Sequence, residues 1–230
     1  LSRGLGDVYK RQITYRAESS IQTCSICYKE QLTNAVCENG HFICDACHSY
    51  GTYAPVITTL RDSTEKDALL LLEKIMDLPS VHMHGPEHHA IVPCVLLTAF
   101  RNNGEHMAYD VALSEICKRA KQVPGGTCGY WGVCGAAAGA GIFMSVMTGS
   151  SPLHKDAWPF PQKLVSIILS RLADVGGPRC CKRTSRIAIE EAVHFYSQFC
   201  SVNIPLSSIT CKYCEDNREC IQEDCPYYPE

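Results

Sequence analysis

The stretch CSICYKEQLTNAVCENGHFICDACH, residues 24–48, decides how the N-terminal part of this chain folds. It holds two C-x2-C pairs, Cys24 with Cys27 and Cys44 with Cys47. Two residues between cysteines let one tight turn aim both sulfurs at the same ion, and tetrahedral zinc takes four such ligands. The pairs therefore predict one zinc site, in preference to four buried free thiols at ligand spacing by chance.

Cys37 and His41 lie between these pairs and form half of a second site. The spacing matches the first six ligands of a cross-brace module such as a RING finger, which binds two interleaved ions. The last pair of such a module is absent directly downstream, so we hypothesise that a further C-x2-C pair preceded Ile13. In the competing interpretation, Cys37 and His41, and with them His48, only form hydrogen bonds or pack.

Residues 1–12, LSRGLGDVYKRQ, resemble a translated adapter string and are set aside from the fold, although a disordered basic leader would read similarly. Residues 13–50 are predicted to be a small zinc-ribbon or cross-brace-like module, and residues 51–62 a connector. Such a module has almost no apolar core, so its zinc is expected to be structural.

The whole chain has 230 residues, a net charge of -3 and 16 cysteines. Without a basic excess, a nucleic-acid partner is not expected. The longest apolar run, residues 133–147, is shorter than the roughly 20 residues that a bilayer requires, so no membrane span is expected. Cysteines at metal-ligand spacing need a reducing compartment, which indicates a cytoplasmic protein.

Residues 63–205 carry helix-period apolar patterns and predict a helical domain, so the fold class is mainly α. The expected helices begin or end at capping and breaking residues. They cover Ser63 to Pro79, Pro93 to Asn103, Tyr109 to Lys121, the small-residue segment after Cys134, Trp158 to Gly176, and Thr184 to Phe199.

Three segments of this domain carry candidate chemistry. The first, HMHGPEHH at residues 82–89, gathers four histidines and Glu87, which favours a ligand or acid–base role over a wet polar loop. The second, residues 125–135, places Cys134 at a helix N-terminus, which stabilises a thiolate. Gly139 and Gly141 follow and are expected to permit close helix packing. Inert core cysteines are the alternative.

The third segment is GGPRCCKR, residues 176–183, where basic residues would offset thiolate charge. A four-ligand site that suits an iron–sulfur cluster as well as zinc is predicted from cysteines of the second and third segments and one histidine of the first. The candidates are Cys128, Cys134, Cys180, Cys181, His84, His88 and His89.

The tail, residues 206–230, is a predicted metal-binding segment. Its ligand candidates are Cys211, Cys214, Cys220 and Cys225. A proline after the last cysteine is similar to ferredoxin cluster loops, although the spacing differs. Zinc and a cluster both fit, and so does a purely structural clip.

Taken together, GHFICDACH (40–48), HGPEHH (84–89), GGTCGYWGVCGAAAGAGIF (125–143), GGPRCCKR (176–183) and the tail around Asn217 and Pro226 resemble an uncharacterised cysteine-rich domain of anaerobic archaea and bacteria. The resemblance covers nearly all of residues 13–230 and implies no activity. Some members adjoin methyltransferase-like domains, which implies a methyltransferase-like or redox protein as partner. Residues 128–141 are more distantly similar to redox proteins with a C-G-A-x-x-G signature.

Three functions follow from these patterns. The leading hypothesis is a metal-binding protein with structural zinc and a Cys/His redox or iron–sulfur site. The second is an enzyme in which Cys134 is the nucleophile and His88 or Glu87 the acid or base, with methyl or sulfur transfer as the reaction. The third is a zinc adaptor without catalysis that binds protein or RNA.

Overall fold

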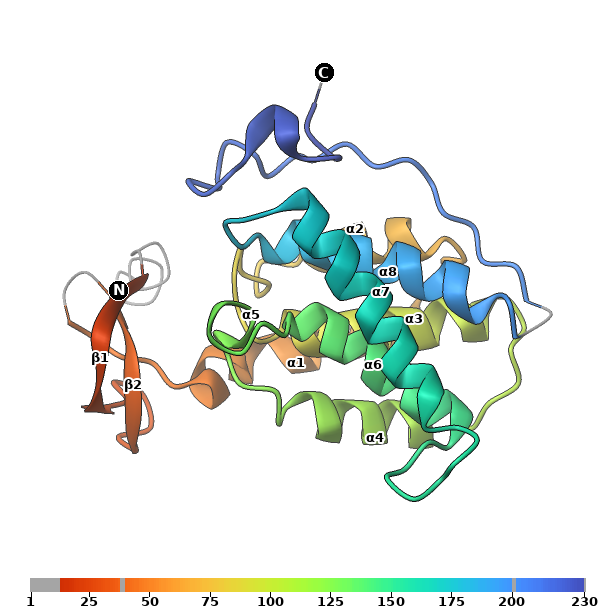
Figure 1. Cartoon of the computed structure of the whole chain (residues 1–230), viewed down its shortest axis with the longest axis horizontal. Coiled ribbons are helices and arrows are strands. Elements are labelled where there is room, and N and C mark those ends of the chain that lie inside the picture. Colours follow the sequence, from red (N-terminus) through yellow and green to blue (C-terminus); the bar gives the residue numbers. More distant parts are fainter. Residues whose placement is uncertain (1–12, 38–39, 200–201, 230) are drawn as a thin grey trace. The chain divides into compact units, whose positions relative to one another are not determined.

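The computed structural model describes residues 13–37, 40–199 and 202–229, and the chain divides into two compact units, Leu1–Tyr50 and Gly51–Glu230. The prediction of a mainly helical chain with a small N-terminal module and a cysteine-rich tail is confirmed (Figure 1). The prediction for residues 1–12 lies outside the described residues, and so does the pair hypothesised before Ile13.

The N-terminal unit is a two-stranded antiparallel hairpin followed by the second cysteine pair. Strand β1 (Ile13–Thr23) pairs with β2 (Glu30–Cys37), with Ile21 opposite Leu32 and an irregularity between Tyr15 and Ser20. Its small core consists of Cys24, Val36, Phe42 and Cys44, all buried. So few apolar side chains cannot hold a segment of this size, and the sulfur atoms form a large share of the core.

Helix α1 (Asp45–Asp62) occupies residues 51–62, so the predicted connector was wrong. Its apolar residues Val56 and Leu60 recur one turn apart and are buried in the helical unit, which gives this segment a packed face. Residues 63–67 have no regular structure, so the next helix starts later than the predicted Ser63. Helix α2 (Ala68–Met76) starts after Asp67 instead, whose carboxylate accepts hydrogen bonds from two backbone N–H groups.

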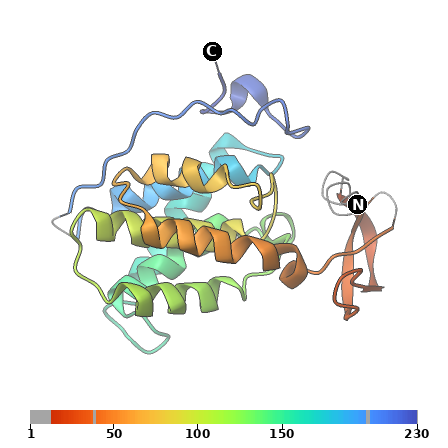
Figure 2. The same ribbon diagram turned by 180° about the vertical axis from the view of Figure 1, so that it is seen from behind.

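The central helix of the second unit is α3 (His88–Asn102), in which every residue from His88 to Phe100 is buried. It begins earlier than predicted, so Pro93 lies inside the helix and not in its first turn. A helix that is apolar all round must be covered on all sides. Helices α2, α4 (Tyr109–Ala120), α6 (Gly135–Thr148) and α8 (Cys181–Tyr196) pack against it (Figures 1 and 2).

The small residues of α6 allow it to approach α3 closely, as predicted for Gly139. A Cβ atom at Gly139 would lie 2.5 Å from the carbonyl oxygen of His89, whose usual helical partner is missing because residue 93 is proline. Helix α7 (Pro159–Val175) covers α6 and α8, and the short α5 (Thr127–Tyr130) precedes α6. None of the described helices is long and apolar enough to cross a membrane.

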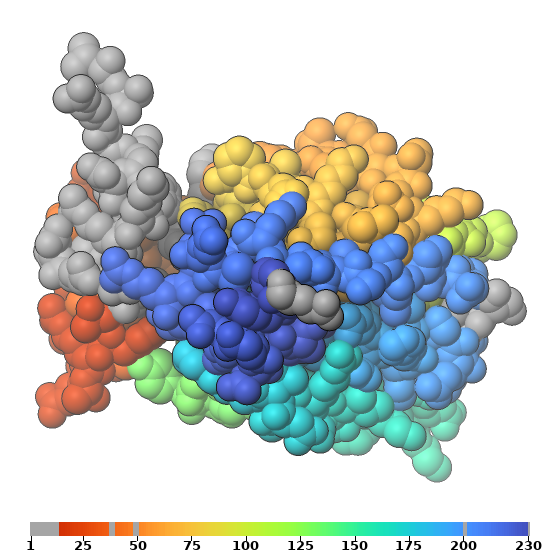
Figure 3. Space-filling model, turned by 90° about the horizontal axis from the view of Figure 1, so that it is seen from above, coloured from red at the N-terminus to blue at the C-terminus, as the bar shows by residue number. Residues whose placement is uncertain are grey.

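The C-terminal tail contains one short 3-10 helix, η1 (Gln222–Asp224). The rest of the described tail has no regular secondary structure and runs across the helical unit (Figure 3). Hydrogen bonds fix it to the helices: the backbone N–H of Ser207 donates to Asp67, the Tyr213 hydroxyl to Asp77, and the Tyr227 hydroxyl to Glu190. The tail is therefore part of the second unit.

Candidate metal centres

The four cysteines at the end of the hairpin converge. The ligand atoms of Cys24, Cys27, Cys44 and Cys47 all lie within 4.8 Å of one another, and the sulfurs of Cys27 and Cys44 are 3.7 Å apart. A tetrahedral zinc ion with Zn–S bonds of about 2.3 Å holds its sulfurs about 3.8 Å apart. This arrangement could hold a metal ion, as the two C-x2-C pairs predicted.

Local structure explains how the pairs meet. Cys24 follows β1 directly and forms an isolated bridge with Phe42, which brings the second pair alongside the first. The Cys24–Cys27 turn closes when the N–H of Tyr28 donates to the carbonyl of Cys24, and Tyr28 takes a left-handed φ of 59°. Cys47 lies in the first turn of α1, so strand, turn and helix each fix part of the site.

The electrostatics of the four thiols are uneven. Burial opposes ionisation of Cys24, but hydrogen bonds from the backbone of Cys27, Cys44 and Ile26 outweigh it and lower the pKa of the thiol to about 6. Burial and the neighbouring sulfurs raise the pKa of Cys47 to about 12. Four thiolates so close together repel one another, and a bound cation would remove that penalty.

Cys37 and His41 are the remaining predicted ligands of the N-terminal unit. The side chain of Cys37 lies outside the described part of the structure, and His41 is exposed. Their half-site therefore stays a prediction.

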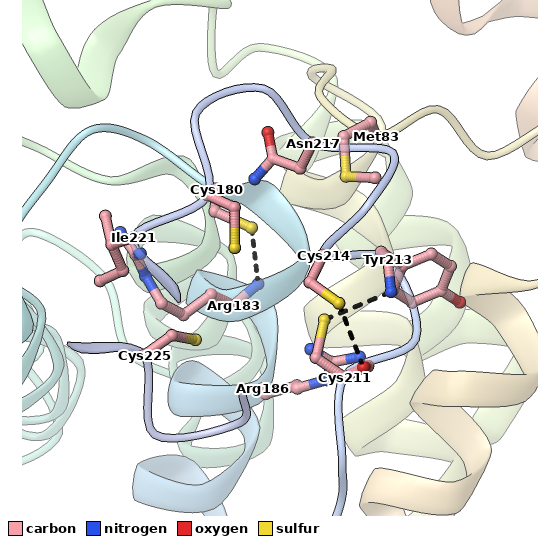
Figure 4. Close-up of a pocket in the computed structure, with 11 residues that line it drawn as sticks. Met83, Cys180, Arg183, Arg186, Cys211, Tyr213, Cys214, Asn217, Ile221 and Cys225 are labelled. Carbon is pink, nitrogen blue, oxygen red and sulfur yellow. Dashed lines mark hydrogen bonds between the residues drawn. The ribbon is translucent and has the colours of Figure 1, made fainter. Parts of the chain in front are cut away.

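A second group of cysteines surrounds a small pocket of the helical unit (Figure 4). Four come from the tail and the fifth, Cys180, caps the N-terminus of α8. The pocket is lined by Met83, Cys180, Arg183, Arg186, Cys211, Tyr213, Cys214, Asn217, Cys220, Ile221 and Cys225.

The residues of the predicted Cys/His site in the helical domain do not all lie around one point. Cys180 faces the tail pocket, whereas the pKa of Cys181 is raised to about 12 by burial and by neighbours that include Cys134. Cys128 is exposed but close enough to add to the rise that burial causes in the pKa of the half-buried Cys134 thiol. Within the described residues, the N-terminal four form the single group of three or more ligand atoms at one-ion spacing.

The histidines of the first segment are held by other contacts. His88 is buried, its Nε2 lies 3.0 Å from the carbonyl oxygen of His82 and its Nδ1 lies 3.2 Å from the Ser185 hydroxyl. His89 Nδ1 lies 3.1 Å from the carbonyl of Val123. His84 contacts Asn217 and Glu219 of the tail at 3.1 and 3.3 Å. Each of these three histidines therefore has its own set of partners.

Glu87 and His82 form a contact that the sequence patterns did not indicate. The fully buried Glu87 carboxylate accepts from the backbone N–H of His82 at 3.1 Å and lies 2.9 Å from His82 Nδ1. Glu87 also favours the charged form of Lys182, whose pKa is nevertheless lowered to about 8 because burial outweighs that attraction. The carboxylate is thus engaged in structure at the start of α3.

Arg186 was not among the candidates, yet it is the most buried charged side chain near the pocket. Its guanidinium binds Glu73 in a bidentate pair at 2.7 and 3.0 Å, and none of its side chain is exposed. The sequence offered little indication of this role, because an arginine on an amphipathic helix is usually a solvent-exposed residue.

A family model matches residues 56–228 of the chain. The chain belongs to DUF5714, a family of unknown function. The match to DUF5714 covers most of the helical unit, including all four tail cysteines, and begins after the hairpin cysteines. Neither a curated protein nor a solved structure matches the chain.

Proposed function

We propose that this DUF5714 member is a metal-binding protein, with structural zinc in the N-terminal unit and a thiolate-rich redox or iron–sulfur centre in the helical unit. The observation that carries the proposal is the convergence of four cysteine sulfurs within 4.8 Å. Among the described residues, this is the one group of three or more ligand atoms at the spacing that a single ion needs.

Zinc is the ion that fits this site best. Four thiolates in a tetrahedral arrangement are typical of structural zinc, and they leave no coordination position open for a substrate. Binding energies on the order of 10–16 kcal/mol are typical of such modules, enough to organise a hairpin whose apolar core is this small. The role of the ion is then to shape the N-terminal unit.

The cysteine nucleophile is a weaker candidate. An effective nucleophile needs a lowered thiol pKa, but burial raises the pKa of Cys134 despite hydrogen bonds from the backbone of Ala137 and Ala136. His88 also holds both ring nitrogens in internal contacts, so it is poorly disposed to act as the base.

One observation favours an adaptor role as the second candidate. Ile21 and Leu32 face each other across the hairpin, and their exposed fractions are 67% and 72%. Two opposed apolar side chains lie on the same face of a hairpin, which is the kind of surface that a protein partner covers. The zinc ion would then present this face rigidly.

Metal analysis of the anaerobically purified chain tests the proposal. Wild-type protein should contain zinc, and Cys27→Ser should lose one equivalent per chain. Ser25→Ala, an exposed change within the same C-x2-C turn, should keep it. Equal zinc contents in wild type and Cys27→Ser would rule out the hairpin cysteines as the site.

A further inference from the structure

The tail cysteines and Cys180 border one space from different sides. Cys211 and Cys214 enter it from one side of the tail, Cys225 from another and Cys180 from α8, as Figure 4 shows. The tail has almost no regular structure of its own, and few of its side chains are buried. In addition to its hydrogen bonds to the helices, a segment of this kind gains stability from a metal or other cross-link.

The spacing of these thiols differs from that of the hairpin thiols. Although five cysteines line the pocket, no three of them bring their sulfurs within 4.8 Å of one another, unlike the hairpin four. A single tetrahedral ion needs the short spacing. A cluster places several metal ions and sulfides between its cysteine ligands and therefore holds them farther apart. Five thiols that line one space without one-ion spacing match a cluster better than a single zinc ion.

The pocket wall carries buried positive charge that a bound anionic group would offset. Arg183 has only 3% of its surface exposed, and no carboxylate among the described residues forms an ion pair with it. Its Nη2 donates to the carbonyls of Gly176 and Pro178, while its Nε is buried without a hydrogen-bond partner. A buried cation in this situation is costly unless a negative group lies nearby.

Arg186 adds a second buried positive group to the same wall. Glu73 neutralises it in part, but its Nη1 is buried without a hydrogen-bond partner. Cluster thiolates and sulfides would supply the missing negative charge for both guanidinium groups.

Backbone N–H groups already point at three of the sulfurs. The N–H of Arg183 donates to Cys180, that of Tyr213 to Cys211 and that of Gln222 to Cys220, each at 3.4 Å. Hydrogen bonds of this kind stabilise thiolates and tune the potential of iron–sulfur clusters.

We propose that this pocket binds a [4Fe–4S]-type iron–sulfur cluster, with Cys211, Cys214, Cys220 and Cys225 as its ligands. Cys180 then borders the cluster on the side of α8, and Arg183 and Arg186 offset its charge. This inference rests on the proposed function, because it gives the second centre of the metal-binding protein its ligands and its chemical class.

Anaerobic reconstitution of the full chain with ferrous iron and sulfide tests this assignment. Wild-type protein should take up iron and acid-labile sulfide in equal amounts, turn brown and show a paramagnetic signal after reduction with dithionite. The double variant Cys220→Ala/Cys225→Ala should lose all three signals and keep its hairpin zinc.

Cys128→Ala is the matched control, because Cys128 is a cysteine of the same unit outside the pocket. This variant should bind as much iron and sulfide as wild type. Cluster loss in Cys128→Ala with retention in the double variant would overturn the assignment. So would a colourless protein with two zinc ions, one of which the double variant loses. Zinc in the hairpin without iron in the pocket would refute this inference alone, and the reverse result would refute the zinc assignment alone.

Discussion

Gly139 allows α6 to lie directly on the backbone of α3, and Gly139→Ala tests that contact. In an open helix position, glycine to alanine stabilises a protein by up to about 1 kcal/mol. Here the new Cβ would lie 2.5 Å from the carbonyl oxygen of His89 and 2.9 Å from Cδ of Pro93. Neither atom belongs to a flexible side-chain end, so the helices must separate.

The expected cost follows from these two opposing effects. Overpacking costs typically about 1–3 kcal/mol, and contact with backbone puts this site near the upper end. Subtracting the helix-propensity gain of about 1 kcal/mol leaves a net destabilisation of about 2 kcal/mol. For a unit of this size each kcal/mol lowers Tm by roughly 2–4 °C, so we expect a drop of roughly 4–8 °C.

Two other glycines serve as controls in the same assay, thermal unfolding of the metal-loaded chain followed by helical circular dichroism. A Cβ at Gly51 in α1 would meet nothing within 4 Å, so Gly51→Ala should raise Tm. At Gly141 the close atom is Cγ2 of Val165 at 2.5 Å, which belongs to a side chain and not to the backbone, so Gly141→Ala should lower Tm less than Gly139→Ala does. A Tm for Gly139→Ala at or above that of wild type would refute the close packing of α3 and α6.

Three further predictions concern buried groups. Glu73→Gln leaves the charge of Arg186 buried without its partner and should lower the free energy of unfolding, measured by chemical denaturation, by about 3–5 kcal/mol. Glu115→Gln removes an exposed pair with Arg119 and should be nearly neutral. Equal losses in the two variants would contradict a strong contribution from the buried pair. Burial lowers the pKa of His88 to about 4, so the unfolded state takes up a proton that the folded state refuses, and stability should fall as pH drops from about 6.5 to 4. His88→Gln should flatten that slope and His106→Gln, an exposed site, should not; an unchanged slope in His88→Gln would assign it to another group. The sulfurs of Cys94 and Cys117 are 3.7 Å apart, so diamide should join α3 to α4 by a disulfide that peptide mapping detects; free thiols at both positions after treatment would contradict this.

The spacing of apolar residues, together with helix-capping and helix-breaking residues, was enough to predict most of the helices. The apolar spacing and flanking residues of α4 and α7 placed them closely, since both end at helix-breaking sequences. Segment 51–62 was missed because its buried face is narrow and Pro55 lies inside it. The start of α8 was placed too late because the cap is a cysteine, whose sulfur accepts from the N–H of Arg183.

Spacing along the chain predicted the hairpin site and named the four tail cysteines, but it did not predict that they share a pocket with Cys180 and two arginines. The two C-x2-C pairs need only local turns and one bridge to converge. The pocket depends on the path of the tail over α2 and α8, which side-chain contacts such as Tyr227 with Glu190 determine. No local pattern could show that the adjacent Cys180 and Cys181 lie in different surroundings, or that the tail recruits only the first.

We propose that the chain carries two thiolate centres of different composition. Elemental analysis of zinc, iron and acid-labile sulfide in the anaerobically purified full chain tests this most directly. We expect one zinc per chain together with iron and sulfide in equal amounts, with the zinc lost only in Cys27→Ser and the iron only in Cys220→Ala/Cys225→Ala. A single kind of metal at both centres, or metal content unaffected by these variants, would contradict it.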